Sequence, residues 1–191
     1  YSLIQGYEDG TFRPDDSITR GAFAGIMDRF MKFQEISPAQ TFSDTAGTYW
    51  ESAILKLHAA GVYLGNDGKA LPSDTITRQR AFDITSSGTA ALPYGDEALI
   101  ADYARGAVAE MSARGYITDS WNGDFRPTDP ITRAEIVNIF SNMVQTLIQN
   151  SGTHTGDVNG TVMINASGSV SLENMKISGD LILAPGVTGP V

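Results

Sequence analysis

Three arginine residues stand at the same place in three copies of one sequence pattern. Each copy begins with a glycine, has a proline four residues later, and ends four to six residues after that in Ile-Thr-Arg. The copies are 10–20, 68–78 and 123–133, and their arginines are 58 and 55 residues apart, a period that indicates small tandem repeats. A guanidinium group is a planar fork of N–H donors that fits a carboxylate. The chemistry that the pattern offers is therefore the binding of an anion.

Each Thr-Arg pair has the signature of a helix start. Thr132 is followed three residues later by Glu135, which predicts a capping box in which each side chain bonds the other residue's backbone N–H. Thr19 and Thr77 lack this glutamate, and we expect them to cap their helices alone. A cation in the first turn opposes the helix dipole by several tenths of a kcal/mol, roughly. Arg20, Arg78 and Arg133 therefore call for a compensating anion, such as a carboxylate held by the arginine fork and by helix N–H groups.

Glycines and aromatic residues near the arginines extend this candidate site. Gly6 and Gly65 would let a ligand approach the backbone closely, and the Tyr7 ring could stack on a face of that ligand. Trp50 lies on an apolar helical stripe, so a core role is as well supported as a ligand role. Trp121, in an Asn-Gly turn, is the tryptophan that we expect to be more exposed.

A structural role for the three arginines is the alternative. Each could pair with a nearby carboxylate or with a neighbouring repeat and so only stabilise the fold. The nearby carboxylates are Asp16, Asp74 and Asp129. Arg80 takes the glutamate position of the second repeat, which puts two cations in one helical turn. We therefore expect Arg78→Ala to cost less ligand affinity than the same change at Arg20 or Arg133.

Apolar periodicity predicts helices on both sides of the glycine turns. Stripes at helical spacing cover residues 23–30 and 136–147, whereas the stripe after Thr77 is interrupted and predicts a short helix. Helices are also predicted over 50–57 and 104–111. Glycines follow these last two helices, as is common just past a helix end. They are Gly61 and Gly115.

The chain after Gln149 has a different pattern. Short alternating strings at 161–164, 169–172, 175–177 and 180–183 predict strands between Gly, Asn and Asp turns. Val162 and Ile164 recur 19 residues later as Leu181 and Leu183, which favours the first coil of a parallel β-helix or similar solenoid.

Composition excludes several classes of function. The 191 residues carry a net charge of −9, which argues against nucleic-acid binding because that needs a basic face. There is no cysteine, so disulfides, thiolate ligands and thiol nucleophiles are excluded. No run approaches the roughly 18 apolar residues of a membrane span. The sequence shows no basic-then-apolar signal peptide, so we expect any export signal to lie upstream of Tyr1 or to have been removed.

The helical repeats resemble S-layer homology domains. The residues that carry the resemblance are 6–15 and 18–20 in the first repeat, Phe42-Ser43-Asp44, Trp50, Gly61-Val62 and 76–78 in the second, and 125–127 and 131–135 in the third. The resemblance implies a mainly α fold, in which three helix–loop–helix repeats form a pseudo-threefold unit. It divides the chain into repeats at 1–34, 35–92 and 93–150, a linker at 151–157 and the start of a β-solenoid at 158–191.

The same resemblance implies an extracellular function at the cell wall or S-layer. Members of the family anchor surface proteins by binding secondary cell-wall polysaccharide, often pyruvylated, in grooves between repeats. Identical or other surface-protein chains are further candidate partners, and no cofactor or metal is implied. Carried over residue by residue, the ligand-binding set is Arg20, Arg78, Arg133, Gly6, Tyr7, Asp44, Trp50, Gly65 and Trp121, with Thr19, Thr77, Thr132 and Glu135 capping the helices.

The repeats depart from the family pattern in two places. The third repeat shows no counterpart of the Phe42-x-Asp44 and Trp50 positions, and offers Asp102-Tyr103 and Ala104 instead. The first repeat begins almost at its glycine turn, without a leading helix, so we expect the chain to be a piece of something longer.

Three other functions are weighed against anchoring. Catalysis is not expected, because His58 and His154 have no partner motif and the carboxylates have no telling spacing. A calcium site is not expected, because the acidic turns lack the ligand frame of such a loop. An assembly module that makes mainly protein–protein contacts in an S-layer or filament remains open. The sequence thus favours non-covalent anchoring to acidic, pyruvylated wall polysaccharide, with lattice assembly as the alternative.

Overall fold

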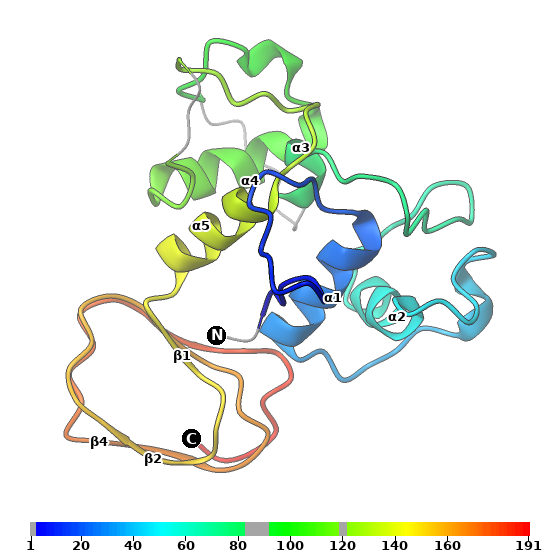
Figure 1. Ribbon diagram of the computed structural model, residues 1–191. Coiled ribbons are helices and arrows are strands. Elements are labelled where there is room, and N and C mark those ends of the chain that lie inside the picture. Colours follow the sequence, from blue (N-terminus) through cyan, green and yellow to red (C-terminus); the bar gives the residue numbers. More distant parts are fainter. Residues whose placement is uncertain (1–2, 83–91, 119–121) are drawn as a thin grey trace.

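The computed structural model describes residues 3–82, 92–118 and 122–191, and its helices precede its strands (Figure 1). The helices are α1 (Arg20–Met31), α2 (Glu51–Ala59), α3 (Arg78–Ala81), α4 (Asp102–Ala113) and α5 (Arg133–Met143), with short 3₁₀ turns at Ala39–Thr41 and Glu97–Leu99. The strands are β1 (Thr146–Ile148), β2 (Gly152–Thr155), β3 (Val162–Ile164), β4 (Val170–Glu173) and β5 (Leu181–Leu183). Among the described residues, no helix has the length and apolar character needed to cross a bilayer.

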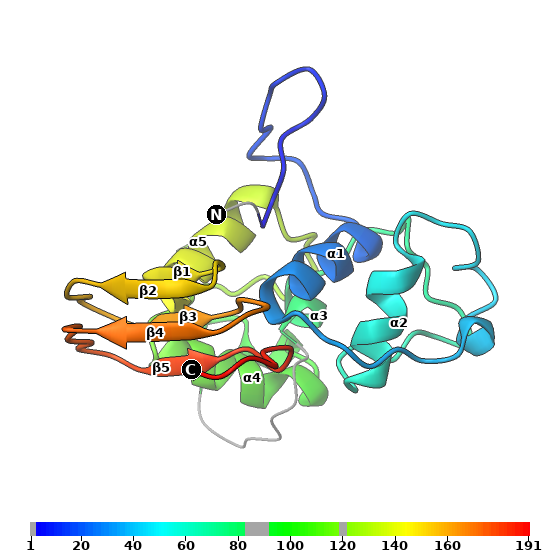
Figure 2. The ribbon, with the colours of Figure 1, turned by 90° about the horizontal axis from the view of Figure 1, so that it is seen from below.

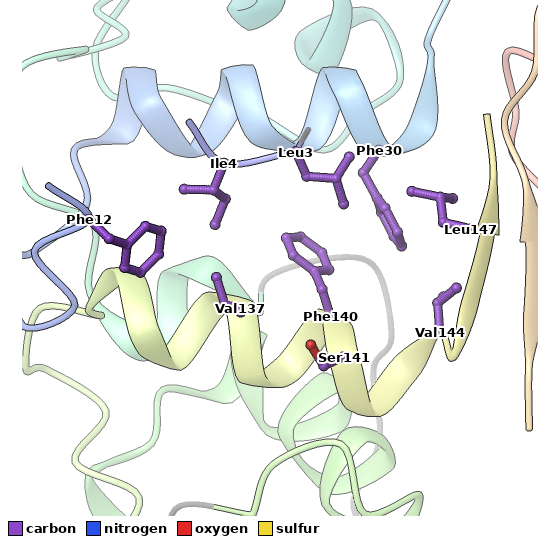
Figure 3. A pocket seen from close by; sticks show the side chains of 9 residues that line it. All are labelled: Leu3, Ile4, Phe12, Phe30, Val137, Phe140, Ser141, Val144 and Leu147. Carbon is purple, nitrogen blue, oxygen red and sulfur yellow. The ribbon is translucent and has the colours of Figure 1, made fainter. Parts of the chain in front are cut away.

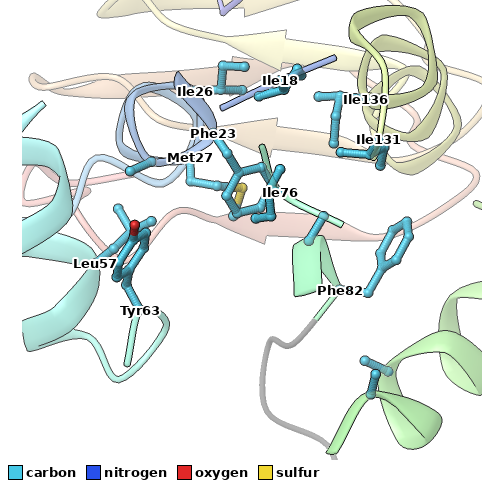
Figure 4. Packing of buried hydrophobic residues seen from close by; sticks show 14 of the residues in the cluster. Ile18, Phe23, Ile26, Met27, Leu57, Tyr63, Ile76, Phe82, Ile131 and Ile136 are labelled. Atoms are coloured by element: carbon cyan, nitrogen blue, oxygen red, sulfur yellow. The ribbon is translucent and has the colours of Figure 1, made fainter. Parts of the chain in front are cut away.

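The three repeats are joined by a closed ring of backbone hydrogen bonds. The N–H of Ile18 donates to the carbonyl oxygen of Ile131 at 3.0 Å, that of Ile131 to Ile76 at 3.0 Å, and that of Ile76 to Ile18 at 2.9 Å. All three isoleucine side chains are buried in the main core (Figure 4). Each repeat therefore makes the same bond to another, and the third bond closes the ring.

The helix starts of α1, α3 and α5 depend on the same ring. The N–H groups of Arg20 and Gly21 donate to the carbonyl oxygens of Asp74 and Pro72 at 2.8 and 2.9 Å. These N–H groups open α1 and have no partner within their own helix, so the turn of the next repeat supplies one. The equivalent donors and acceptors are Arg78 with Asp129, Gln79 with Pro127, Arg133 with Asp16, and Ala134 with Pro14. The fixed spacing from proline to arginine thus has a structural cause.

Helices α1 and α2 pack through a tryptophan on two glycines. A Cβ atom added at Gly21 or Gly25 would lie 2.4 or 2.6 Å from the ring of Trp50, so only glycine leaves room for it. Lys56 and Asp28 form an ion pair at 3.2 Å across the same pair of helices. Helices α3 and α4 pack differently. The larger Gln79 stands at the position of Gly21, and its side chain accepts a hydrogen bond from the N–H of Ala101 at 2.9 Å.

Helix α5 turns an apolar stripe toward a cavity of about 330 Å³ (Figure 3). The residues that line it are Leu3, Ile4, Phe12, Phe30, Val137, Phe140, Ser141, Val144 and Leu147. Val137 is 38% exposed, whereas Ala24, its equivalent in α1, is 0% exposed on the face that packs against α2. The described residues 3–19 contain no helix that could cover α5 in the same way.

Two expectations about helix lengths have different outcomes. Helix α3 covers only four residues, as its interrupted stripe predicts. The prediction of a helix reaching Leu147 is wrong, because α5 ends at Met143 and Val144 is already extended. Leu147 is apolar at the helical spacing, but it belongs to β1, which pairs with β3. A strand partner distant in sequence therefore overrides the local helical pattern.

The C-terminal residues form two small parallel sheets. Their strand orders are β1-β3-β5 and β2-β4, and Figure 2 shows the strands side by side next to the helices. Thr146 pairs with Val162 and Val162 with Leu181, so successive strands are offset by 16 and 19 residues. Strands β1 and β2 begin within the stretches expected to be helix and linker. The sheets are not closed into a solenoid.

The parallel sheets are fastened to the end of α1. The side-chain amide of Asn165 donates to the carbonyl oxygens of Arg29 and Phe30 at 3.1 and 2.9 Å. The N–H of Gly186 donates to the carbonyl oxygen of Met31 at 3.2 Å. The last carbonyl groups of a helix receive no hydrogen bond from N–H groups of the same helix. These bonds therefore supply donors that the carbonyl groups would otherwise lack. The end of α1 is therefore completed by residues more than 130 positions later in the chain.

We predict that Asn165→Ala lowers the free energy of unfolding by about 1–3 kcal/mol, because two carbonyl groups beside a buried side chain lose their donor. Urea denaturation followed by circular dichroism measures the change. Asn159→Ala is the matched control, because Asn159 is exposed and its side chain accepts a hydrogen bond from the Ser178 hydroxyl at the surface. We expect this variant to stay within about 0.5 kcal/mol of the parent chain. Equal effects of the two substitutions would contradict this account of the junction.

Candidate functional site

The three motif arginines make one shared contact. The Nε–H of Arg20 donates to the carbonyl oxygen of Ala70 at 2.9 Å, that of Arg78 to Phe125 at 2.6 Å, and that of Arg133 to Phe12. Each acceptor is the second residue after the motif glycine of another repeat. The Nε–H edge of every guanidinium group thus joins two repeats. The surroundings of its two terminal nitrogens decide whether the group can bind a ligand.

Arg78 is enclosed in the protein. It is 1% exposed, and its guanidinium lies 2.7 Å from the carboxylate of Glu135, which is itself buried. Arg126 approaches the same carboxylate at 3.7 Å. For Arg78, the structure therefore places the compensating anion inside the chain, in the helix start of the third repeat.

Arg20 lies in a narrow groove beside Tyr63. Its guanidinium carbon is 4.8 Å from the centre of the Tyr63 ring, and the Tyr63 hydroxyl donates to the carbonyl oxygen of Ala70, which Arg20 also contacts. We call this hollow the Arg20 groove; its lining residues are Arg20, Phe23, Val62, Tyr63, Leu64, Gly65, Ile76 and Arg80. Burial raises the pKa of the Tyr63 hydroxyl, and the charges of Arg20 and Arg80 oppose that rise. Both guanidinium groups thus act on one hydroxyl.

Arg133 lies among aromatic rings at a more open place. Its guanidinium carbon is 4.9 Å from the ring centre of Tyr7 and 4.7 Å from that of Phe12, and we call these three residues the Arg133 cluster. Its NH2 group also donates to the carbonyl oxygen of Gln5 at 2.7 Å. The Tyr7 hydroxyl donates to Asp16 at 2.9 Å, and this hydrogen bond raises the pKa of Tyr7.

Beside Tyr7 lies an open hollow of about 510 Å³. It is lined by Gly6, Tyr7, Glu8, Asp9 and Arg13. Gly6 approaches the chain closely, since an added Cβ would lie 3.0 Å from the carbonyl oxygen of Thr11. The expected neighbours Gly6, Tyr7 and Arg133 are therefore brought together.

Asp44 holds the glycine turn of its own repeat. Its carboxylate accepts hydrogen bonds from the N–H groups of Ala70 and Leu71, both at 2.8 Å. Burial raises the pKa of this carboxyl, but the two hydrogen bonds outweigh burial and leave its pKa below the usual range. Gly65 has a packing reason as well, because an added Cβ would lie 2.4 Å from the Phe42 ring.

The third repeat does contain a counterpart of Phe42-x-Asp44, contrary to expectation. Asp96 accepts from the N–H groups of Phe125 and Arg126 at 2.8 and 2.7 Å, which repeats the geometry of Asp44. Tyr94 stands in place of the phenylalanine, so the search for Phe-x-Asp missed the pair. An aromatic-x-Asp pattern would have found it, whereas Asp102 lies in the first turn of α4.

The tryptophans and caps have the following places. Trp50 is half-buried against α1, in agreement with a core role, and Trp121 lies outside the described residues.

The capping box of Thr132 and Glu135 is confirmed by both hydrogen bonds, and the Thr19 hydroxyl accepts from the N–H of Ala22 at 3.1 Å. Among the described residues, the Thr77 hydroxyl makes no such cap bond, so the prediction that it caps α3 is wrong. In the same part of the chain, no group of three His, Asp or Glu residues could hold a metal ion.

The comparisons with known proteins agree on one family. The sequence matches the S-layer homology domain over residues 1–24, 41–79 and 93–137. It is 26% identical to the amylopullulanase of Thermoanaerobacterium thermosulfurigenes over 155 residues, which are 75% of this chain and 8% of that protein.

Two proteins of Acetivibrio thermocellus are similar as well. Cell surface glycoprotein 1 is 26% identical over 165 residues, with 75% of this chain and 7% of that protein covered. The cellulosome-anchoring protein is 25% identical over 176 residues, with 84% of this chain and 37% of that protein covered. The chain thus spans a minor part of each relative.

We predict that Arg78→Met lowers the free energy of unfolding by about 3–5 kcal/mol, because Glu135 loses its closest cationic partner inside the protein. Arg133→Met should cost only about 1 kcal/mol, since it removes hydrogen bonds near the surface. Urea denaturation of both variants measures the difference. The double variant Arg78→Met/Glu135→Gln should recover part of the loss. Equal losses at Arg78 and Arg133 would show that the buried pair has no special role.

Proposed function

Since the chain belongs to the S-layer homology domain family, which places it at the cell surface in association with the cell wall, we propose that it binds an acidic, pyruvylated secondary cell-wall polysaccharide. The domains of this family anchor surface proteins to the cell envelope. The Arg20 groove and the Arg133 cluster are the proposed sites. We expect the chain to act by binding alone, without catalysing a reaction.

The observation that carries the proposal is the pairing of a cation with an aromatic ring at both sites. Arg20 lies over Tyr63, and Arg133 lies over Tyr7 and Phe12. The rings of Tyr7 and Phe12 are exposed and can stack on a sugar, whereas the buried Tyr63 ring supports Arg20. A guanidinium group can bind a carboxylate on that sugar through two hydrogen bonds. An acidic sugar offers both partners at once. Arg78 differs, since Glu135 already supplies its carboxylate.

We also propose that the parallel sheets are the first coils of a β-solenoid that forms a stalk. Val162 and Ile164 are 0% exposed inside the segment, and their register partners Leu181 and Leu183 fall on the same column of side chains. Both leucines are exposed, as expected where the next coil would stack. The parallel register and the offset of 19 residues support this proposal.

Hydrogen exchange can test the stalk proposal. The carbonyl oxygen of Asp180 and the N–H of Ala184 face β3, so the N–H groups of Leu181 and Leu183 face the open edge. In a longer version of the protein that continues past Val191, we expect these two amides to exchange at least tenfold more slowly than in the 191-residue chain. The amide of Ile182, which faces β3, is the internal control. Unchanged exchange at Leu181 and Leu183 would contradict a stacked coil.

The anchoring proposal is tested by binding of the chain to purified wall polysaccharide, with and without its acidic ketals. We expect binding that requires the ketal and falls at least tenfold in Arg20→Ala and in Arg133→Ala, because each loses a charged hydrogen-bonding partner of the sugar carboxylate. Sedimentation with the insoluble polymer measures affinity, and thermal denaturation shows that each variant is folded.

Two results would overturn this proposal. Binding that does not depend on the ketal would show that the arginines do not bind the polysaccharide through its ketal carboxylate. Failure of the folded parent chain to bind any wall polysaccharide would favour the alternative, an assembly module that makes protein–protein contacts. We would then expect the chain to self-associate in sedimentation experiments.

A further inference from the structure

Asp44 and Asp96 hold the equivalent turns of the second and third repeats in the same way. Each carboxylate accepts hydrogen bonds from two consecutive backbone N–H groups, at 2.7 to 2.8 Å. The second donor of each pair has a positive φ, 55° at Leu71 and 56° at Arg126. Successive N–H groups in such a turn form a concave anion site. The backbone of the turn is therefore shaped to receive a carboxylate.

The first repeat has the same pair of donors, the N–H groups of Phe12 and Arg13, which we call the N–H pair. The φ of Arg13 is 50°, so the backbone conformation matches that of the other two turns. The carbonyl oxygen of Phe12 accepts from Arg133, as that of Ala70 accepts from Arg20. In the part of the chain that the structure describes, neither N–H group of the pair donates to a protein acceptor. Both donors can therefore bind a carboxylate that another segment or molecule supplies.

The surface beside the N–H pair has room for an aromatic ring. In the second repeat, an added Cβ atom at Gly65 would clash with the ring of Phe42, which therefore packs directly on this glycine. Among the described residues, an added Cβ at the equivalent Gly6 would have only backbone atoms of its own turn within 4 Å. Ile4 stands at the position of Tyr63, whose ring centre is 6.1 Å from that of Phe42. A ring two residues before a bound aspartate would thus contact Gly6 and Ile4.

The apolar face of α5 begins next to the N–H pair. Phe12 supplies the first donor of the pair, and its side chain also lines the cavity of about 330 Å³ along α5 (Figure 3). In the other two repeats, the chain that supplies the aspartate continues into α2 or α4, and these helices pack on α1 and α3. One continuous segment thus contacts both features there. On α5, Val137 is 38% exposed at the position where Ala24 of α1 is covered.

We propose that the N–H pair and the apolar face of α5 together form a docking site for a polypeptide segment in which aromatic-x-Asp precedes an amphipathic helix. The aspartate binds the two N–H groups, the aromatic ring lies on Gly6, and the apolar side of the helix covers Val137 and Phe140. A polypeptide fits better than an acidic sugar, because a helix that follows the aspartate fills the apolar cavity as well as binding the N–H pair.

This docking site is separate from the candidate site for the polysaccharide carboxylate. The carbonyl oxygen of Phe12 and the N–H of Arg13 belong to one trans peptide bond and point in opposite directions. Arg133 bonds that oxygen, so its guanidinium group and the bound aspartate would lie on opposite sides of the peptide. The inference therefore does not rest on the proposed polysaccharide binding, and the two can be tested apart.

A synthetic peptide with the sequence of residues 92–113 is the probe, because it carries Tyr94-x-Asp96 followed by α4. Nuclear magnetic resonance follows the backbone amides of Phe12 and Arg13 in the 191-residue chain. We expect both signals to shift, with half of the full shift at about 0.1 mM peptide. The same peptide with Asp96→Asn should bind at least tenfold more weakly, because the two N–H groups lose a charged acceptor.

Two variants of the 191-residue chain test the apolar half of the site. Val137→Glu places a charge on the face that the helix would cover, and it should weaken peptide binding at least tenfold. Ile36→Glu is the matched control, because Ile36 is an exposed aliphatic residue in the segment between α1 and α2. It should leave peptide binding within twofold of the parent chain. Thermal denaturation shows that both variants are folded.

Three results would overturn this inference. They are no shift of the two amides up to about 1 mM peptide, equal affinity of the aspartate and asparagine peptides, and equal effects of Val137→Glu and Ile36→Glu. A shift of the N–H pair by the acidic polysaccharide in place of the peptide would assign the pair to the sugar, and would overturn it too. Peptide binding as expected, together with no polysaccharide binding, overturns the proposed function alone.

Discussion

The exchange of hydrogen bonds between consecutive repeats is the constraint on which the rest of the structure depends. The opening N–H groups of α1 bond the turn that ends at Asp74, and the side chain of Arg20 bonds Ala70 in the same turn. The other two repeats do the same around the ring. A helix start whose donors are satisfied only by another repeat cannot be stable by itself. The ring therefore makes the three repeats one cooperative unit, and the candidate sites lie where two repeats meet.

Local signals account for the part of the fold that the sequence predicts well. The stripes of α1, α2 and α4 and the glycine stop signals of α2 and α4 depend on residues a few positions apart, and so does the capping box of Thr132. The end of α5 was not predictable in this way. Leu147 continues the helical stripe, but strand pairing with β3 outweighs it. Asp96 was missed because tyrosine replaced phenylalanine in its motif, although its hydrogen bonds match those of Asp44.

At the candidate site, too, local sequence does not reveal the contacts that the three arginines make with distant residues. Their local sequences are nearly alike, so the sequence identified them as one set. What distinguishes them lies about one repeat away: Glu135 beside Arg78, Arg80 beside Arg20, and the ring of Tyr7 beside Arg133. The structural alternative therefore holds for Arg78, whereas ligand binding by Arg20 and Arg133 stays a prediction. All three guanidinium groups lie over an aromatic ring, that of Phe125 in the case of Arg78, but only Arg78 has a buried carboxylate beside it.

A ligand in such a groove would act on the fold as well as on the anchor. Arg20 belongs to the first repeat and Tyr63 to the second, so one sugar that met both would bridge two repeats. The internal pair of Arg78 and Glu135 already makes such a bridge between the second and third repeats. An acidic sugar in the Arg20 groove would supply from outside the carboxylate that Glu135 supplies from within. Binding energy would then reinforce the ring that holds α1, and through Asn165 the sheets fastened to the end of α1.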